Sequence, residues 1–175
     1  MHCTGSRMSA CAVHFLNVEV ILKRMDKTDM EIIPFVLDRY EEVYSLWMSC
    51  KNMGFNNVDD SYEGIGKLVL KNPETCFLAL EDEKVIGTVL AGNDGRRGYV
   101  YHLCVAEKYR RQGVAGRLVD AMLDGMRKEG ISKVALVMFS YNEDANAFYE
   151  KIGFTKRNDL IYRNIALVDL KRIDT

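Results

Sequence analysis

The segment over residues 99–118 constrains the fold more than any other part of the chain. Its first seven residues, Tyr99–Val105, are apolar or aromatic apart from one histidine and are typical of a buried strand. A short basic loop follows, and Gly113 and Ala115 open an amphipathic helix. Small residues at a helix start let the free amides of the first turn approach a bulky anion, and the helix dipole adds positive potential. This unit indicates a pyrophosphate-binding site. The arginines within it are Arg110, Arg111 and Arg117.

Two other phosphate-binding motifs are excluded by spacing. The dinucleotide fingerprint Gly-x-Gly-x-x-Gly fails, because Ala115 and Leu118 stand where its second and third glycines would be. A P-loop fails at Gly64–Leu68, which lacks both the four-residue spacing between glycines and the hydroxyl after the lysine. An ordinary basic surface turn remains the structural alternative.

A second motif lies at residues 142–154. Asn142 stands where its side chain can cap a helix, and Gly153 stands where a left-handed residue would end it. Ala145, Phe148 and Tyr149 are spaced i, i+3 and i+4, so they share one face. Taken alone, this pattern fits an amphipathic helix that buries two aromatic rings. Its position after the first motif, with a strand over residues 133–139 between them, favours a functional interpretation.

Together, the two segments resemble motifs A and B of the GCN5-related N-acetyltransferase (GNAT) family. The resemblance covers residues 30–168, and the loop at residues 93–98 is similar to the YpeA-like bacterial branch. It implies an α+β (mixed α/β) GNAT fold, with a mostly antiparallel six- to seven-stranded sheet splayed at the cofactor site and about four helices. We expect an N-terminal extension over residues 1–29 and the N-acetyltransferase domain over residues 30–170.

The resemblance also implies an activity. We expect an acetyl-CoA-dependent N-acetyltransferase that moves the acetyl group directly to a primary amine, on a small molecule or a peptide N-terminus. A non-catalytic acyl-CoA sensor or partner module is the alternative from another class, and a longer acyl donor is the alternative within catalysis. Tyr149 is the expected catalytic acid that protonates the departing thiolate. The expected CoA-binding residues are Leu103, Cys104, Val105, Arg110, Arg111, Gln112, Gly113, Val114, Ala115, Gly116, Asn142, Ala145, Phe148 and Tyr149.

A general base is harder to assign. His102 has the right chemistry, since histidine exchanges protons near neutral pH. Strict strand alternation, however, puts Tyr99, Tyr101, Leu103 and Val105 on one face and His102 with Cys104 on the other. In family members with a base on this strand, it precedes the valine by four or six positions, where this chain has tyrosines. Proton loss through ordered water is the favoured arrangement, and a β-bulge that shifts the alternation would favour His102.

Composition excludes several classes of protein. A formal net charge of −1 argues against nucleic acid as a partner, and no apolar run reaches the length of a membrane span. Five cysteines without a Cys-x-x-Cys pair fit a reducing cytoplasm and imply no metal site. Monomer and homodimer both remain open. Helices are expected over residues 38–50, 61–70, 113–128 and from 142, and strands over 31–35, 76–80, 85–91, 99–105 and 133–139, with a final strand pair within 154–170.

Overall fold

A central five-stranded sheet organises the protein. The computed structural model describes residues 30–175, so the extension expected over residues 1–29 lies outside the described residues. Neighbouring strands are antiparallel except for the last pair, β5 and β6, which is parallel. The spatial order is β1 (Glu31–Pro34), β3 (Phe77–Glu81), β4 (Lys84–Asn93), β5 (Gly98–Val105) and β6 (Val134–Leu136).

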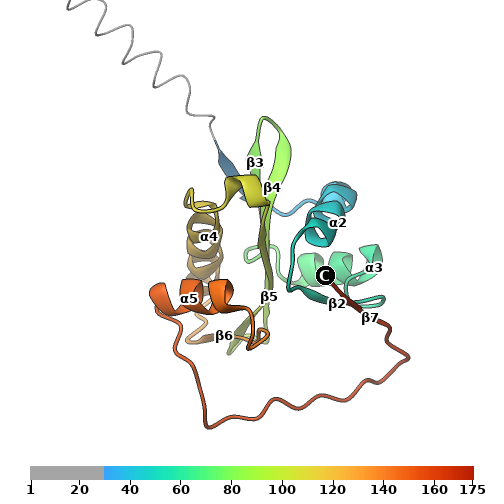
Figure 1. Ribbon diagram of the computed structural model, residues 1–175, viewed down its shortest axis with the longest axis vertical. Helices are drawn as coiled ribbons and strands as arrows, with labels where there is room; N and C mark the ends of the chain where they lie inside the picture. Colours follow the sequence, from blue (N-terminus) through green and yellow to red (C-terminus); the bar gives the residue numbers. More distant parts are fainter. Residues whose placement is uncertain (1–29) are drawn as a thin grey trace, which may run out of the picture.

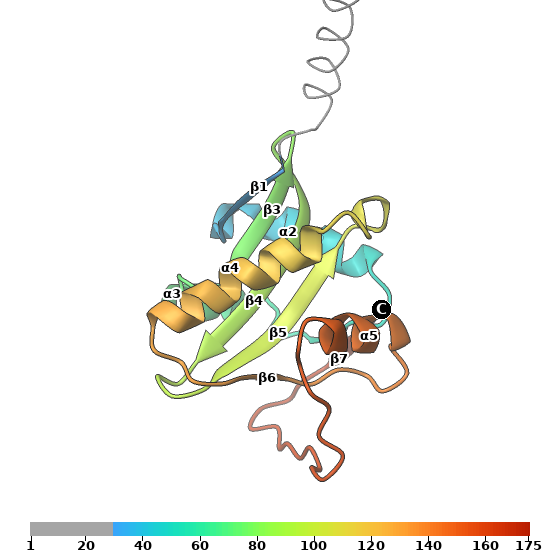
Figure 2. The same ribbon diagram turned by 90° about the vertical axis from the view of Figure 1, so that its left-hand side faces the viewer.

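Helices cover both faces of this sheet. Figure 1 shows the sheet nearly edge-on, with α4 and α5 on one side and α2 and α3 on the other. Figure 2 shows α4 lying across β3, β4 and β5. Among residues 30–175, no helix combines the length and apolar character that a membrane crossing requires. The helices are α2 (Tyr40–Ser49), α3 (Tyr62–Lys71), α4 (Val114–Lys128) and α5 (Glu143–Lys151), with single 3₁₀ turns η1 (Leu37–Arg39) and η2 (Glu107–Tyr109).

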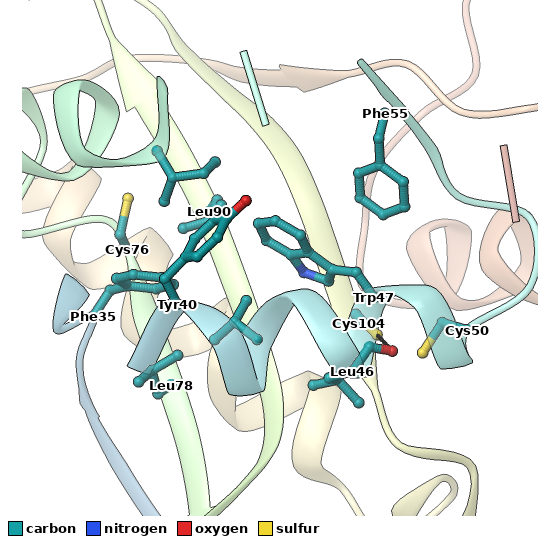
Figure 3. Close-up of a cluster of buried hydrophobic side chains, with 12 residues drawn as sticks. Phe35, Tyr40, Leu46, Trp47, Cys50, Phe55, Cys76, Leu78, Leu90 and Cys104 are labelled. Carbon is teal, nitrogen blue, oxygen red and sulfur yellow. Dashed lines mark hydrogen bonds between the residues drawn. The ribbon is translucent and has the colours of Figure 1, made fainter. Parts of the chain in front are cut away.

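Each face of the sheet has its own apolar core. On the α4 face, Leu118, Met122 and Met126 are buried against the sheet, as their helical spacing predicts. On the α2 face, Val43 and Trp47 are fully buried, and Figure 3 shows the Trp47 side chain inside this cluster. The two cores hold the sheet rigidly between them, so the strand that borders the predicted cofactor site has a fixed position.

The fold class expected from the sequence is confirmed, but the strands are divided differently. Seven strands in the described residues form two sheets, because β2 (Gly54–Asn56) pairs antiparallel with β7 (Arg172–Asp174) apart from the main sheet. The strand pair expected within residues 154–170 is wrong, since this segment contains no strand. It leaves α5 on one side of the sheet and reaches β7 on the other (Figure 1), so it forms an extended connection instead of lying along the sheet edge.

Candidate active site

The predicted site lies where β5 and β6 separate. Their parallel pairing covers three positions, from Gly98 opposite Val134 to Val100 opposite Leu136, and then stops. Residues 101–105 keep β4 as a neighbour on one side, and no strand of residues 30–175 pairs with them on the other. The strand edge there carries backbone donors and acceptors that an extended ligand can use, much as an added strand would. This is the opening expected to hold the pantetheine arm against Leu103, Cys104 and Val105.

A β-bulge in β5 coincides with the end of that pairing. Leu90 of β4 faces His102, whereas the next residue, Ala91, faces Val100, so Tyr101 is the extra residue. Val100 and Leu103 therefore both pack on the α4 face although they are three positions apart. The expectation of strict alternation along β5 is therefore wrong for the residues before the bulge, whereas His102 and Cys104 share the α2 face as expected. Tyr99, which borders α3, does not share a face with Leu103.

The turn before α4 presents backbone amides to the same opening. Gly113 caps α4 with φ +85, a left-handed conformation that glycine adopts without strain. The first helical hydrogen bond runs from the Arg117 amide to the Gly113 carbonyl at 3.0 Å, so the preceding amides have no helical acceptor. Gly113 and Gly116 also have open space where a side chain would begin. The geometry suits a large anion approaching the backbone closely.

Two of the three arginines are engaged by the protein itself. Arg110 Nε donates to the Val105 carbonyl at 3.2 Å, and Arg117 Nη2 donates to the Met30 carbonyl at 2.9 Å. Gln112 closes the loop by donating from Nε2 to the Lys108 carbonyl at 2.8 Å. The Arg111 side chain is exposed and has no hydrogen bond within residues 30–175. The amides therefore offer more direct contacts for a phosphate than the guanidinium groups do.

Helix α5 borders the opening and is fixed at both ends, as its sequence predicts. At its start, Asn142 Oδ1 accepts a hydrogen bond from the Ala145 amide at 3.3 Å. At its end, Gly153 is left-handed with φ +97, and the Phe154 amide donates to the Tyr149 carbonyl at 2.9 Å. This is a Schellman motif, with the Phe154 ring 5.2 Å from the Tyr149 ring. The helix therefore presents Tyr149 in a fixed position.

Tyr149 combines burial with access to the opening. Its side chain is 8% exposed and packs between the rings of Phe148 and Phe154. Burial raises the pKa of its phenol above the usual range, so the hydroxyl is protonated at neutral pH. Asn142, Ala145 and Phe148 line the same cleft beside it. The structure thus brings the expected residues of α5 to one wall.

Cys104 points away from this chemistry. Its thiol belongs to the buried cluster on the α2 face and lies 4.0 Å from the Leu46 carbonyl. A hydrogen bond with Cys50 and its own burial raise the pKa of the Cys104 thiol. The thiol is therefore a protonated packing group of the buried cluster. Its backbone remains available at the open strand edge.

Asp60 is the site residue that sequence reasoning missed. Its Oδ1 lies 2.6 Å from His102 Nε2, and the two side chains are 9% and 13% exposed. The residues are 42 positions apart, and no local motif connects them. His102, Asp60 and Tyr149 line one cleft of about 2290 Å³, which also includes the start of α4 and Phe55. The fold and this cleft suit a long phosphorylated ligand that lies beside a splayed strand.

Comparison with known proteins identifies this architecture. A model of the Acetyltransferase (GNAT) family matches residues 40–154, so the chain belongs to this family. N-alpha-acetyltransferase 30 of Schizosaccharomyces pombe is 37% identical over 89 residues, which cover 48% of this chain and 59% of that protein. Acetyltransferase SG1711 of Sodalis glossinidius is 28% identical over 140 residues, 80% of this chain and 97% of the relative.

Solved structures share the fold. The NatC complex bound to Gag peptide and CoA matches with a TM-score of 0.63 and 21% identity, over 74% of this chain and 86% of the matched chain. The expected family, fold class and enzyme class, an N-acetyltransferase that uses acetyl-CoA, are therefore confirmed. The resemblance to the YpeA-like branch and the individual site residues remain predictions.

Proposed function

We propose that this protein transfers the acetyl group of acetyl-CoA directly to a primary amine, with Tyr149 as the general acid. The observation that carries the proposal is the junction of three features at one cleft: the open edge of β5, the free amides before α4, and the Tyr149 side chain. Along a CoA thioester, the sulfur would lie near Tyr149, the pantetheine arm along the β5 edge and the pyrophosphate at the amides before α4. No metal is part of the proposal.

In this assignment the cofactor lies along β5 with its pyrophosphate at the start of α4. Backbone groups of the open strand hold the pantetheine arm and polarise the acetyl carbonyl as an oxyanion develops. Residues 142–149 form the other wall, close to the thioester sulfur. The proposed cofactor contacts are Leu103, Cys104 and Val105 on β5, Arg110, Arg111, Gln112, Gly113, Val114, Ala115 and Gly116 around the α4 start, and Asn142, Ala145, Phe148 and Tyr149 on α5.

The acid step has a definite energetic constraint. A free thiol titrates near ~8.5 and a phenol near ~10, so proton transfer from Tyr149 to a free thiolate is uphill. The raised pKa of the buried phenol increases this gap. Donation therefore has to be coupled to proton loss from the attacking nitrogen, which regenerates the phenol. We expect a contribution at the low end of general acid catalysis, ~10²-fold.

Removal of the phenol hydroxyl tests this role. Tyr149→Phe keeps the ring between Phe148 and Phe154, so the melting temperature and CoA affinity should barely change while the turnover number falls ~10²-fold. Turnover is followed by release of the CoA thiol. The matched control is Tyr62→Phe, which removes a hydroxyl from a ring that is 46% exposed on α3. Wild-type turnover in the Tyr149 variant, with chemistry rate-limiting, would refute the assignment.

A second experiment tests the phosphate site. Gly113→Asp places a carboxylate against the proposed pyrophosphate and should abolish CoA binding in calorimetry. Gly95→Asp is a matched control, because Gly95 has a similar φ of +80 and open space around it, in the turn between β4 and β5. Both variants carry the same backbone strain and the same charge. Equal CoA affinity in the two variants would contradict the assignment of the pyrophosphate site to the turn at Gly113.

The acceptor is proposed to be a primary amine on a small molecule or a peptide N-terminus. The name of the Schizosaccharomyces pombe relative supports an α-amine as the first class to try. A panel of polyamines, aminoglycosides, amino acids and peptides, assayed by thiol release, separates these classes. CoA binding without turnover on any acceptor would instead favour the sensor.

The wider assignments rest on sequence features. We propose residues 30–170 as the catalytic domain and residues 1–29 as an extension, in a cytoplasmic protein that is monomeric or homodimeric. Cys50, Cys76 and Cys104 are free thiols, which supports a reducing compartment. Nucleic acid is not a proposed partner, since the net charge is −1. A membrane is not a proposed partner either, since no apolar run of the sequence reaches the length of a span.

A further inference from the structure

His102 shares the α2 face of β5 with Cys104, as alternation from residue 102 onward predicts. Its ring centroid lies 5.1 Å from that of Trp47 and 4.9 Å from that of Phe55. Figure 3 shows the Trp47 side chain on α2 and the Phe55 side chain near it, and the centroids of these two rings lie 5.4 Å apart. Two aromatic walls limit the motion of the imidazole and shield one of its sides from water. His102 also lines the cleft that contains Tyr149.

Asp60 fixes both the orientation and the tautomer of the imidazole. Its Oδ1 lies 2.6 Å from His102 Nε2, while its Oδ2 accepts a hydrogen bond from the Asn56 amide at 2.7 Å. Its backbone carbonyl accepts a hydrogen bond from the Tyr40 hydroxyl at 2.8 Å. A carboxylate can only accept, so Nε2 of the neutral imidazole carries the proton and Nδ1 keeps its lone pair.

A purely structural role of His102 would not require a free Nδ1. Within residues 30–175, no group forms a hydrogen bond with His102 Nδ1, and this atom is not fully enclosed by protein. The side chain is 13% exposed, in the wall of the cleft. A proton acceptor held by a carboxylate, with its lone pair open to a ligand cleft, has the arrangement of a general base.

We propose that the His102–Asp60 pair is the general base that deprotonates the acceptor amine, an inference that rests on the proposed acetyl transfer. The ammonium group of the acceptor gives one proton to His102 Nδ1, which passes it to solvent. The free amine then attacks the acetyl carbonyl, and the C–S bond breaks. The sulfur takes the Tyr149 proton, and the phenolate takes the second proton of the attacking nitrogen. One amide, one thiol and one released proton balance the reaction.

A purely structural pair predicts a different result. In that case His102 and Asp60 would connect β5 to the turn before α3, and their loss would reduce stability and activity equally at every pH. A base instead becomes dispensable where solvent already deprotonates the amine. The pH dependence of the defect therefore separates the two roles. The titratable groups around the imidazole are Asp59 and Asp60 before α3, Tyr40 and Cys50 at α2, and Tyr101 and Cys104 on β5.

The test compares His102→Gln with the wild type across pH 6.5–9.5. The glutamine amide can still donate to Asp60, so the connection between β5 and the turn is retained. We expect kcat/KM for an alkyl amine acceptor to fall ~10²-fold at pH 7, with the defect shrinking to less than ~10-fold at pH 9.5. CoA affinity should stay at the wild-type value. Asp60→Asn keeps a neutral acceptor for Nε2 and should give a smaller, similarly pH-dependent defect.

Asp124→Asn is the control for the charge change, because Asp124 is an exposed residue of α4 paired with Arg127. Wild-type rates in both test variants, or a defect that is constant across pH, would overturn the proposal. If His102→Gln fails to fold, the pH profile of Asp60→Asn decides alone. If the wild-type protein releases no CoA thiol with any amine, the proposed acetyl transfer itself is refuted. A failure of the base assignment is distinguished from this outcome, because it leaves the wild-type protein active.

Discussion

At residue 125, helix α4 lies directly on a backbone carbonyl. A Cβ built on Gly125 would come within 1.8 Å of the Glu74 oxygen, closer than any real contact. The helix and the turn before β3 therefore meet backbone to backbone. This approach sets the depth at which α4 packs on the sheet, and with it the position of the amides at the other end of the helix.

Gly125→Ala should consequently destabilise the protein by about 3 kcal/mol, since the neighbouring atom is backbone and cannot rotate away. The melting temperature should fall by about 6–12 °C. Gly116→Ala on the same helix is the control: no atom of residues 30–175 lies within 4 Å of its Cβ, and the better helix propensity of alanine should add up to about 1 kcal/mol. Thermal unfolding followed by circular dichroism measures both. Equal melting temperatures would show that the Glu74 contact relaxes without cost.

Among the secondary-structure elements, helix α3 begins at a capping residue, Ser61, that the sequence predicts. Ser61 Oγ accepts a hydrogen bond from the Gly64 amide at 3.1 Å and donates to the Val58 carbonyl at 2.7 Å. The cap joins the start of α3 to the turn that carries Asp60. The local geometry of this cap therefore contributes to the position of the proposed base.

Ser61→Ala should lower the free energy of unfolding by about 1 kcal/mol, because a first-turn amide of α3 loses its acceptor. This corresponds to about 2–4 °C in melting temperature. Ser61→Thr retains the hydroxyl and should lie closer to the wild type. Urea titration of the three proteins at one pH gives the comparison. An alanine variant as stable as the wild type would mean that water replaces the cap.

At the scale of the whole molecule, the fold buries ionisable side chains that are more stable there in their neutral form. Cys76 is fully buried, and its Sγ lies 3.3 Å from the Ala91 carbonyl. Burial raises the pKa of its thiol from 9.0 to about 11. Tyr40 behaves in the same way, with a pKa raised to about 12 by burial. Both groups prefer to stay protonated in the folded state, so alkaline pH acts against folding.

The contribution of Cys76 should be complete below pH 9 and lost as pH rises through 11, because the unfolded chain releases the proton first. Two pH units correspond to about 2–3 kcal/mol. Cys76→Ala removes the titrating group, so its free energy of unfolding should fall less steeply between pH 9 and 11 than that of the wild type. Urea unfolding at several pH values measures the two curves. Parallel curves would contradict the prediction.

Short sequence patterns specify the parts of this protein whose contacts lie a few residues apart. The helical spacing of buried side chains, the caps Ser61 and Asn142, and the glycines at 113 and 153 specify elements through contacts a few residues apart. The pattern of small residues after a strand predicts a phosphate site at α4, and together with the second motif at residues 142–154 it indicates the family. These features depend on backbone geometry within single turns, which short patterns encode directly.

The features that join distant residues depend on the packing of the folded chain and could not be predicted from local patterns. The Asp60–His102 contact needs a turn and a strand to meet, and the bulge at Tyr101 depends on the register between β4 and β5. The pairing of β2 with β7 likewise joins segments more than 100 positions apart. Residues 154–170 therefore connect α5 to β7 as an extended segment, where a strand pair was expected. Such contacts are selected by the packing of the whole chain, because no periodicity within one segment specifies which partner will lie opposite.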